Sequence, residues 1–159
     1  MDRIVGQWAT ARPDVDVSPI EVVGRVSRLS RLVDRVLAEN FARFGIESWM
    51  YDVLATLRRG GPPHALTAGE LVRQSMVTTG AITNRIDRLA ERGLVERVAA
   101  ADRRKVVVRL TPAGLDLVDD VVGAHAETEH RILAALAPEE RATLAGLLRT
   151  LLLDLGDGV

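Results

Sequence analysis

The sequence predicts a mainly helical α+β fold in which helices surround one small β-hairpin. Apolar residues recur at helical spacing along most of the chain, while two short runs with strand patterns, 94–98 and 106–110, are joined by a polar link. The chain is 47% hydrophobic but only 3% aromatic, so Leu, Val and Ala carry the burial, which favours helices packed on helices. Its 159 residues suffice for a small domain with an additional dimerisation element.

Two helices are predicted at the N-terminal end. Residues 1–12 place three apolar side chains on one face, and a proline follows them. A longer helix starts next, because Ser18 can cap it, Pro19 suits its first position and Glu21 completes a capping box. It runs to about Arg43, and a glycine ends it. Its apolar residues at helical spacing are Val22, Val26, Leu29, Leu32, Val33, Val36 and Leu37.

Three shorter helices are predicted in the middle of the chain. The first covers residues 48–59, and a Gly-Gly-Pro-Pro break follows it at 60–63. The second covers residues 67–74 and opens with a Thr-x-x-Glu capping box. The third begins at Thr78 or Thr79 and runs to residue 91, after which a glycine stops it.

The hairpin and two long helices complete the chain. The two strand runs enclose the polar link 99–105. Thr111, followed by proline, caps a helix over residues 112–136, and a last helix spans residues 138–155. The last helix carries a wide leucine stripe: Leu144, Leu147, Leu148, Leu151, Leu152 and Leu155.

This order of elements describes a winged helix-turn-helix domain, in which two small helices joined by a tight turn precede a hairpin. We assign this domain to residues 45–111. Residues 1–44 then hold an added N-terminal helix and the first dimerisation helix, and residues 112–159 hold the C-terminal dimerisation helices. These flanking helices have more apolar surface than so small a domain can cover. We therefore expect them to pack against a second copy of the chain.

One segment of the chain is strongly basic. The net charge of −1 alone argues against a nucleic-acid binder. Residues 73–109, however, hold nine Lys and Arg against four acidic residues, whereas residues 110–159 hold three against nine and residues 1–72 are balanced. Such asymmetry is expected where only one lobe faces phosphates. It favours double-stranded DNA as the partner over the alternative, a winged-helix module that contacts only proteins.

The helix that ends at residue 91 has a core face and a polar face. At about 100° per residue, Asn84, Asp87 and Arg88 lie opposite the core face. Asn can pair with adenine and Arg with guanine, and the N-terminal end of such a helix usually reaches base edges. The core face consists of Ile82, Ile86 and Leu89. The candidate base-reading residues are Thr79, Thr83, Asn84 and Arg88.

The tip of the hairpin is Asp102-Arg103-Arg104. An arginine side chain in a narrow minor groove exploits the enhanced negative potential there. Either Arg103 or Arg104 can be the side chain that enters the groove.

The segment from residue 66 to residue 114 resembles the MarR family of transcriptional regulators. The resemblance implies a homodimer that binds a pseudo-palindromic site, with the helix ending at residue 91 in the major groove and the wing in the minor groove. It also implies that Asp102 orients the wing arginine, which corresponds to Arg104. The motifs that carry it are Thr83-Asn84-Arg85-Ile86-Asp87-Arg88-Leu89, Gly93-Leu94-Val95-Glu96-Arg97, Asp102-Arg103-Arg104 and Val108-Arg109-Leu110-Thr111-Pro112-Ala113-Gly114.

A narrower resemblance, to the urate-responsive branch of PecS- and HucR-like regulators, rests on the added N-terminal stretch and on Tyr51–Arg59. It implies a small-molecule effector, and its ligand residues correspond to Trp8, Asp52, Arg85 and Arg97. The chemistry fits a flat monoanion, which suits an indole face for stacking and guanidinium groups for charge-assisted hydrogen bonds.

The position of Arg85 on its helix fits a ligand site. Arg85 lies about 60° from Ile82, on the flank of the core face, and so points partly inward. Urate, xanthine or another planar or polycarboxylate anion remain open as the ligand. Equally open are plain structural roles: an Asp52–Arg85 ion pair, a phosphate contact for Arg97 and packing for Trp8.

Several function classes are excluded or left open. The absence of cysteine excludes disulfides and thiolate metal sites, and the three histidines lack metal-ligand spacing. No catalytic constellation or nucleotide fingerprint is present, so we expect neither an enzyme nor a cofactor. No run of 18 apolar residues and no signal-peptide core occur, so we expect a cytoplasmic protein without a membrane partner. A repressor is favoured, although an activator stays open.

Overall fold

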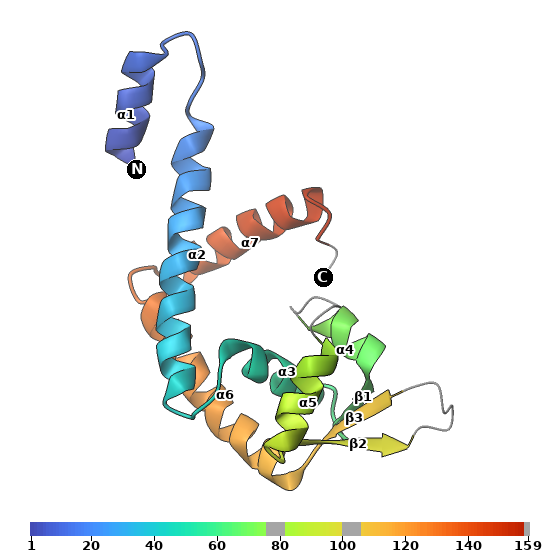
Figure 1. Ribbon diagram of the computed structural model, residues 1–159. Coiled ribbons are helices and arrows are strands. Elements are labelled where there is room, and N and C mark those ends of the chain that lie inside the picture. Colours follow the sequence, from blue (N-terminus) through green and yellow to red (C-terminus); the bar gives the residue numbers. More distant parts are fainter. Residues whose placement is uncertain (76–81, 100–105, 158–159) are drawn as a thin grey trace.

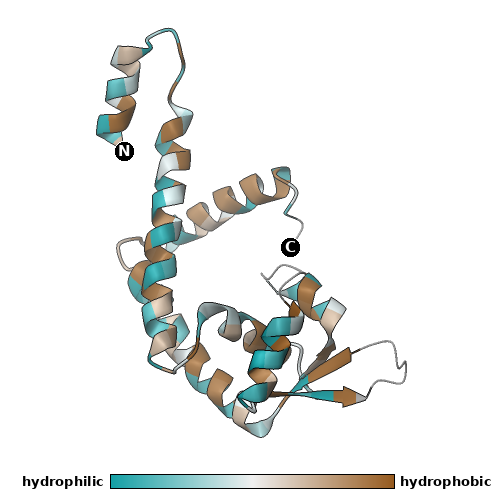
Figure 2. Ribbon diagram, in the orientation of Figure 1, coloured by the Kyte–Doolittle hydropathy of each residue, from teal (hydrophilic) through white to brown (hydrophobic). Residues whose placement is uncertain are grey.

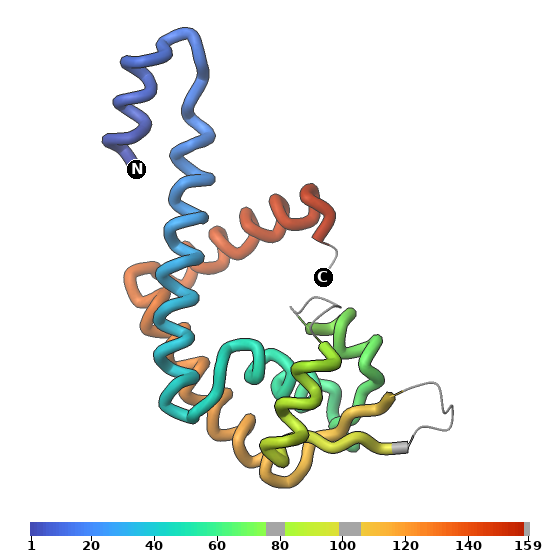
Figure 3. Tube along the Cα trace, viewed as in Figure 1, coloured from blue at the N-terminus to red at the C-terminus, as the bar shows by residue number. Residues whose placement is uncertain are grey.

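The computed structural model describes residues 1–75, 82–99 and 106–157, and Figures 1 and 3 trace them. In chain order, the elements are α1 (Asp2–Ala11), α2 (Pro19–Ala42), α3 (Ser48–Arg59), β1 (Ala65–Thr67), α4 (Ala68–Gln74), α5 (Ile82–Glu91), β2 (Val95–Ala99), β3 (Val106–Leu110), α6 (Pro112–Ile132) and α7 (Pro138–Asp154). The mainly helical α+β class is confirmed. The expected start of the third short helix at Thr78 or Thr79 lies outside the described residues.

The elements form one lobe from which long helices extend (Figure 1). The lobe contains α3, α4, α5 and the sheet. Helix α2 rises from it, α6 runs back along α2, and α1 folds against the far end of α2. An ion pair between Arg25 of α2 and Asp2 of α1 joins these two helices. Helix α7 starts near the middle of α2 and points away from it (Figure 1).

The core of the lobe lies between α3, α5 and the sheet. The face of α5 predicted to be apolar is buried at Ile82, Ile86 and Leu89. It packs with the inward residues of α3, which are Met50, Val53, Leu54 and Leu57, and with Val108 and Leu110 of β3. Arg92, just after α5, donates to the Gly45 carbonyl oxygen at 3.0 Å and so fixes the end of α5 to the turn before α3.

The sheet has three antiparallel strands in the order β1-β3-β2, one more than the predicted hairpin. Strand β2 pairs with β3 as expected, with Arg97 opposite Val108. Strand β1 pairs on the other side of β3, with Leu66 opposite Val108. Three residues are too few to show an alternating pattern, and only the pairing with a distant segment makes them a strand. No local pattern therefore predicts β1.

Of the two capping boxes that the sequence predicts at helix starts, one is present in the structure and the other is not. At α4 the box is present: the Thr67 hydroxyl accepts from the Glu70 N–H at 3.2 Å, and the Glu70 carboxylate accepts from the Thr67 N–H at 2.8 Å. At α2 the predicted box is wrong, because Ser18 already has helical dihedral angles and its side chain makes no cap bond.

Asp16 takes over the capping role at α2. Its Oδ1 accepts from the Ser18 N–H at 3.0 Å, and this backbone hydrogen bond is the main reason that the pKa of Asp16 lies below its ordinary value. Glu21 instead pairs with Arg25 one turn later at 3.0 Å.

Helix α6 starts at a close joint with the lobe. The Thr111 hydroxyl accepts from the Gly114 N–H at 3.1 Å, as the predicted cap requires, and also donates to the Gly93 carbonyl oxygen at 2.6 Å. The Thr111 N–H donates to the Leu94 carbonyl oxygen at 3.2 Å. Helix α6 ends at Ile132, earlier than the expected residue 136, because turns over residues 133–136 separate it from α7.

The apolar faces of α2 and α7 lie open in the single chain, as Figure 2 shows most clearly along α7. Val23 is 66% exposed and Leu147 is 61% exposed. A groove of about 890 Å³ lies between the two helices. Its lining is mostly apolar and includes Val22, Val26, Leu29, Leu144 and Leu148.

A substitution at Gly114 tests the close contact between α6 and the lobe. A Cβ at this position would overlap the Leu94 carbonyl oxygen, so Gly114→Ala should lower the free energy of unfolding by about 1–3 kcal/mol. Gly123 on the same helix is the matched control. An added Cβ there meets no atom of the described residues within 4 Å, so Gly123→Ala should raise stability by about 0.5–1 kcal/mol. Urea titrations of both variants check this, and equal midpoints would contradict it.

Candidate functional site

Around its buried face, helix α5 has one flank beside α3, another flank beside β2 and an exposed edge opposite the core. Thr83 and Asn84, both predicted to read bases, are exposed at the edge that faces away from the core. Arg85 and Arg88 point to the flank beside α3, where both guanidinium groups lie over the Trp49 ring. The opposite flank of α5 faces strand β2. A polar edge free of the core is what a helix needs to enter a DNA groove.

Glu47 and Trp49 form a corner at the start of α3. The Trp49 indole N–H donates to one oxygen of the Glu47 carboxylate at 2.8 Å, and Arg88 donates to the other at 2.6 Å. The Arg88 guanidinium also lies 4.7 Å from the centre of the Trp49 ring. These two donors, the indole N–H first, hold the pKa of the Glu47 carboxyl below its ordinary value. Arg88, predicted to contact DNA, is thus engaged by α3 in the free chain.

Arg85 occupies the inner part of the same flank. Its guanidinium carbon lies 5.5 Å from the centre of the Trp49 ring, and its Nη1 is buried without a hydrogen-bond partner among the described residues. Asp52, half-buried, follows Trp49 by three residues and so lies on the same flank of α3. Of the four predicted ligand residues, Arg85 therefore contacts the Trp49 ring, and Asp52 lies one turn further along α3.

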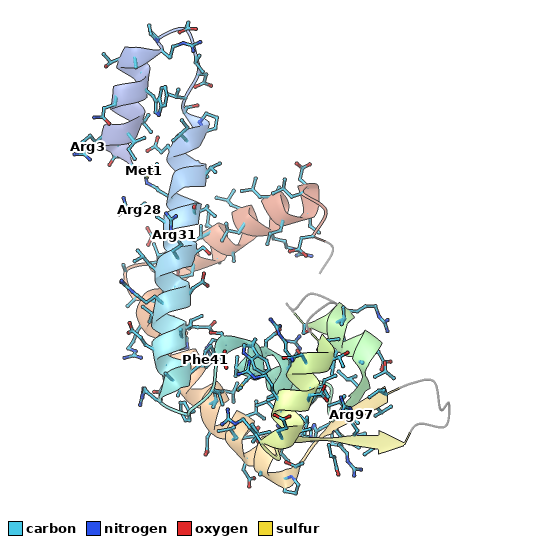
Figure 4. All side chains as sticks on the ribbon, viewed as in Figure 1. Met1, Arg3, Arg28, Arg31, Phe41 and Arg97 are labelled. Atoms are coloured by element: carbon cyan, nitrogen blue, oxygen red, sulfur yellow. The ribbon has the colours of Figure 1, made fainter. Side chains whose placement is uncertain are left out.

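The third predicted ligand residue, Arg97, lies across α5 from this corner. It extends from β2 toward α5, as Figure 4 shows, and donates to the Asp87 carboxylate at 2.5 Å. Asp87 is about 160° from Arg85 around the helix. Asp87, predicted to face outward, therefore faces the sheet and is half-buried.

The fourth predicted ligand residue, Trp8, lies on α1 with 48% of its surface exposed. Helix α1 packs against α2 at the end remote from α3 and α5 (Figure 1). Within one chain, Trp8 is therefore not part of the Trp49 corner. The remaining predicted DNA contacts, Thr79, Asp102, Arg103 and Arg104, lie outside the described residues.

The sequence reasoning missed Trp49 and Glu47. Trp49 precedes the buried Met50 in α3, and its cation contacts, Arg85 and Arg88, come from residues far along the chain. The only local signal was an aromatic residue at the start of a helix. Also missed was a cavity of about 460 Å³ between α2 and α6, lined by residues that include Asn40, Arg43 and Arg131.

Within residues 1–75, 82–99 and 106–157, no group of His, Cys, Asp or Glu side chains could hold a metal ion. No helix in this part of the chain is long and apolar enough to cross a membrane.

The chain is similar in sequence to known transcriptional regulators. Residues 44–105 match the MarR family. Over 146 residues the chain is 40% identical to the HTH-type transcriptional regulator PecS of Dickeya dadantii (strain 3937). The aligned residues make up 91% of this chain and 88% of the relative. The chain belongs to the MarR family. It is a DNA-binding transcriptional regulator of the winged-helix type and not an enzyme, as the sequence predicted.

Solved MarR-family structures share the fold. A MarR variant from E. coli complexed with operator DNA has a TM-score of 0.76 and 27% identity, and the match covers 87% of this chain and 99% of that one. BpsR of Bordetella bronchiseptica, whose DNA binding is regulated by 6-hydroxynicotinic acid, has a TM-score of 0.73 and 26% identity over 82% of this chain and 98% of that one.

The Glu47 carboxyl offers a direct test of the corner. Trp49→Phe removes the largest single cause of its lowered pKa, so that pKa should rise toward the ordinary glutamate value, and Arg88→Ala should also raise it. Because the folded-state pKa is lowered, the corner contacts are complete at neutral pH and are lost as pH falls through that pKa. Carboxyl-carbon NMR titration measures both shifts.

Asp119 is the internal control for this titration. Arg58 lowers the pKa of Asp119 through a separate ion pair, which the Trp49→Phe change does not touch. An unchanged Glu47 titration in both variants would rule out the corner.

Proposed function

We propose that this protein is a homodimeric repressor whose ligand-free form binds a pseudo-palindromic operator and which a small planar anion, such as urate, releases. The observation that carries the proposal is the position of α5. Its exposed edge holds Thr83 and Asn84, while its inner flank holds Arg85 with a buried, unpartnered Nη1 among the described residues. One helix thus presents groups for DNA and a group for an anion.

The dimer is supported by the open apolar faces of α2 and α7. Burial of apolar surface is the main favourable contribution to association, and large exposed apolar patches typically mark interaction sites. In a two-fold dimer, each copy contributes one recognition helix, so the two half-sites lie about one helical turn apart. The domain division at residues 44/45 and 111/112 belongs to this proposal: the lobe contacts DNA and the flanking helices contact the second copy.

The anion is supported by chemistry at Arg85. A flat monoanion can accept charge-assisted hydrogen bonds from the guanidinium and stack on an aromatic face. The similarity to PecS and the effector of BpsR support a small planar acid as the class of ligand. Because α1 lies remote from α5 within one chain, Trp8 would reach the site from the second copy. Arg97 would join it after releasing Asp87.

The DNA contacts are tested by Arg88→Ala and Arg104→Ala. Each should weaken operator binding by about 5- to 150-fold, since one good arginine–base pair contributes roughly 1–3 kcal/mol. Fluorescence anisotropy of a labelled duplex from the gene's own upstream region, at fixed salt, measures the affinity. Arg58→Ala, which removes one charge that is paired with Asp119, is the control and should bind normally; Arg28, also remote from α5 in Figure 4, is less suitable because α2 is proposed to contact the second copy.

Unchanged affinity in both variants would contradict the assigned contacts. Binding without steep salt dependence would favour the alternative, a winged-helix module for protein contacts.

The ligand site is tested by Arg85→Ala and Trp8→Ala. Both variants should fold and bind the operator, but urate should no longer release them. If Trp8 acts from the second copy, mixed dimers of one Trp8→Ala and one Arg85→Ala subunit regain one complete site and partial urate release. Release of both single variants as in the wild type would exclude this site. Binding that ignores urate in the wild type would direct the search to other planar or polyanionic acids.

A further inference from the structure

Two guanidinium groups lie over the single ring of Trp49. Arg85 and Arg88 are three residues apart on α5, and they lie 5.5 Å and 4.7 Å from the centre of the indole ring. Each cation is attracted to the ring, but the two like charges repel each other. The contact of one arginine therefore depends on the charge of the other.

The Glu47 carboxylate neutralises only one of the two. It accepts from Arg88 at 2.6 Å, whereas no described contact places it against Arg85. The buried Nη1 of Arg85 lacks a hydrogen-bond partner within the described residues, and a buried donor in that state is costly. An anion at Arg85 would satisfy this donor and remove its charge from the shared ring.

Arg88 has two alternative partners. In the free chain it lies between Glu47 and Trp49, and on the operator it is proposed to contact DNA. A pair of hydrogen bonds to a base would take up the Nη2 that donates to Glu47, so the two contacts compete. Removal of the repulsion from Arg85 strengthens the contact with Glu47 and Trp49 and thereby weakens the contact with DNA.

We propose that Trp49 and Glu47 are positioning residues that couple anion binding at Arg85 to release of DNA by Arg88. This inference rests on the proposed function. It adds a physical route between the two sites, as coupling requires a difference in contacts between two states. The route involves only α3 and α5 of one chain, so it does not depend on Trp8.

The coupling is measured as the ratio of operator dissociation constants with and without saturating urate. In the wild type this ratio should be on the order of 5–150, the usual range of allosteric coupling. Trp49→Leu removes the ring and should bring the ratio close to one, while calorimetry still detects urate binding. Trp49→Phe keeps an aromatic face and should retain most of the ratio. Circular dichroism and gel filtration confirm that both variants are folded and associated.

Glu47→Gln tests the other partner without any ligand. It frees Arg88, so ligand-free operator affinity should rise about two- to fivefold, the range of an exposed ion pair. Asp119→Asn is the matched control, since it removes a carboxylate paired with Arg58 at a similar exposure. Its affinity and its ratio should equal those of the wild type.

Binding at Arg85 is followed separately by fluorescence. The chain has two tryptophans, Trp8 and Trp49, so the difference between the wild type and Trp49→Phe isolates the emission of Trp49. Urate should quench its emission, and Arg85→Ala should abolish the quenching.

A wild-type ratio in Trp49→Leu, or unchanged or lower affinity in Glu47→Gln, would overturn the coupling role. A wild-type protein that binds the operator but ignores urate would refute the proposed ligand. The Glu47→Gln result would then still decide whether the corner competes with DNA for Arg88.

Discussion

The joint at Thr111 is the contact on which the arrangement of the molecule depends. The Thr111 hydroxyl donates to the Gly93 carbonyl oxygen and accepts from the Gly114 N–H, and so ties the end of α5 to the first turn of α6. The glycine at 114 lets that turn lie directly on the backbone of Leu94. Because α6 then packs along α2, this small joint sets the direction of the long helices relative to the lobe. The distance between two recognition helices in a dimer follows from the same geometry.

Helix α5 is held firmly at its core face and weakly at its sides. Three apolar residues are buried against α3 and the sheet, whereas the flanks are held by exposed ion pairs, Arg88–Glu47 and Arg97–Asp87. Exposed pairs contribute little to stability and exchange partners readily. The arginines can therefore change partners without loss of the core contacts of the helix. The structure separates the function of this helix from its stability by placing them on different faces.

Local patterns in the sequence predicted most of the fold, and contacts between distant segments explain the differences. The Thr67–Glu70 box and the core face of α5 need only neighbours along one helix, and both are present. The box at Ser18 failed because Asp16 competes for the same role two residues earlier. Strand β1 exists only through its pairing with β3. The Trp49 corner needs α3 and α5 together, so local patterns indicated Arg85 and Arg88 but no reason to place an indole against them.

The open apolar faces of α2 and α7 have a consequence for gene regulation. If a second copy covers them, folding and association become one equilibrium, and the stability measured for the chain rises with its concentration. At low expression most of the protein would then consist of dissociated subunits of low stability, which proteases degrade. Occupancy would rise more steeply than the amount of protein made. Association through the leucines of α7 would thus set a minimum amount of protein for regulation. Below this amount the regulated gene would not be controlled, whatever the concentration of the effector.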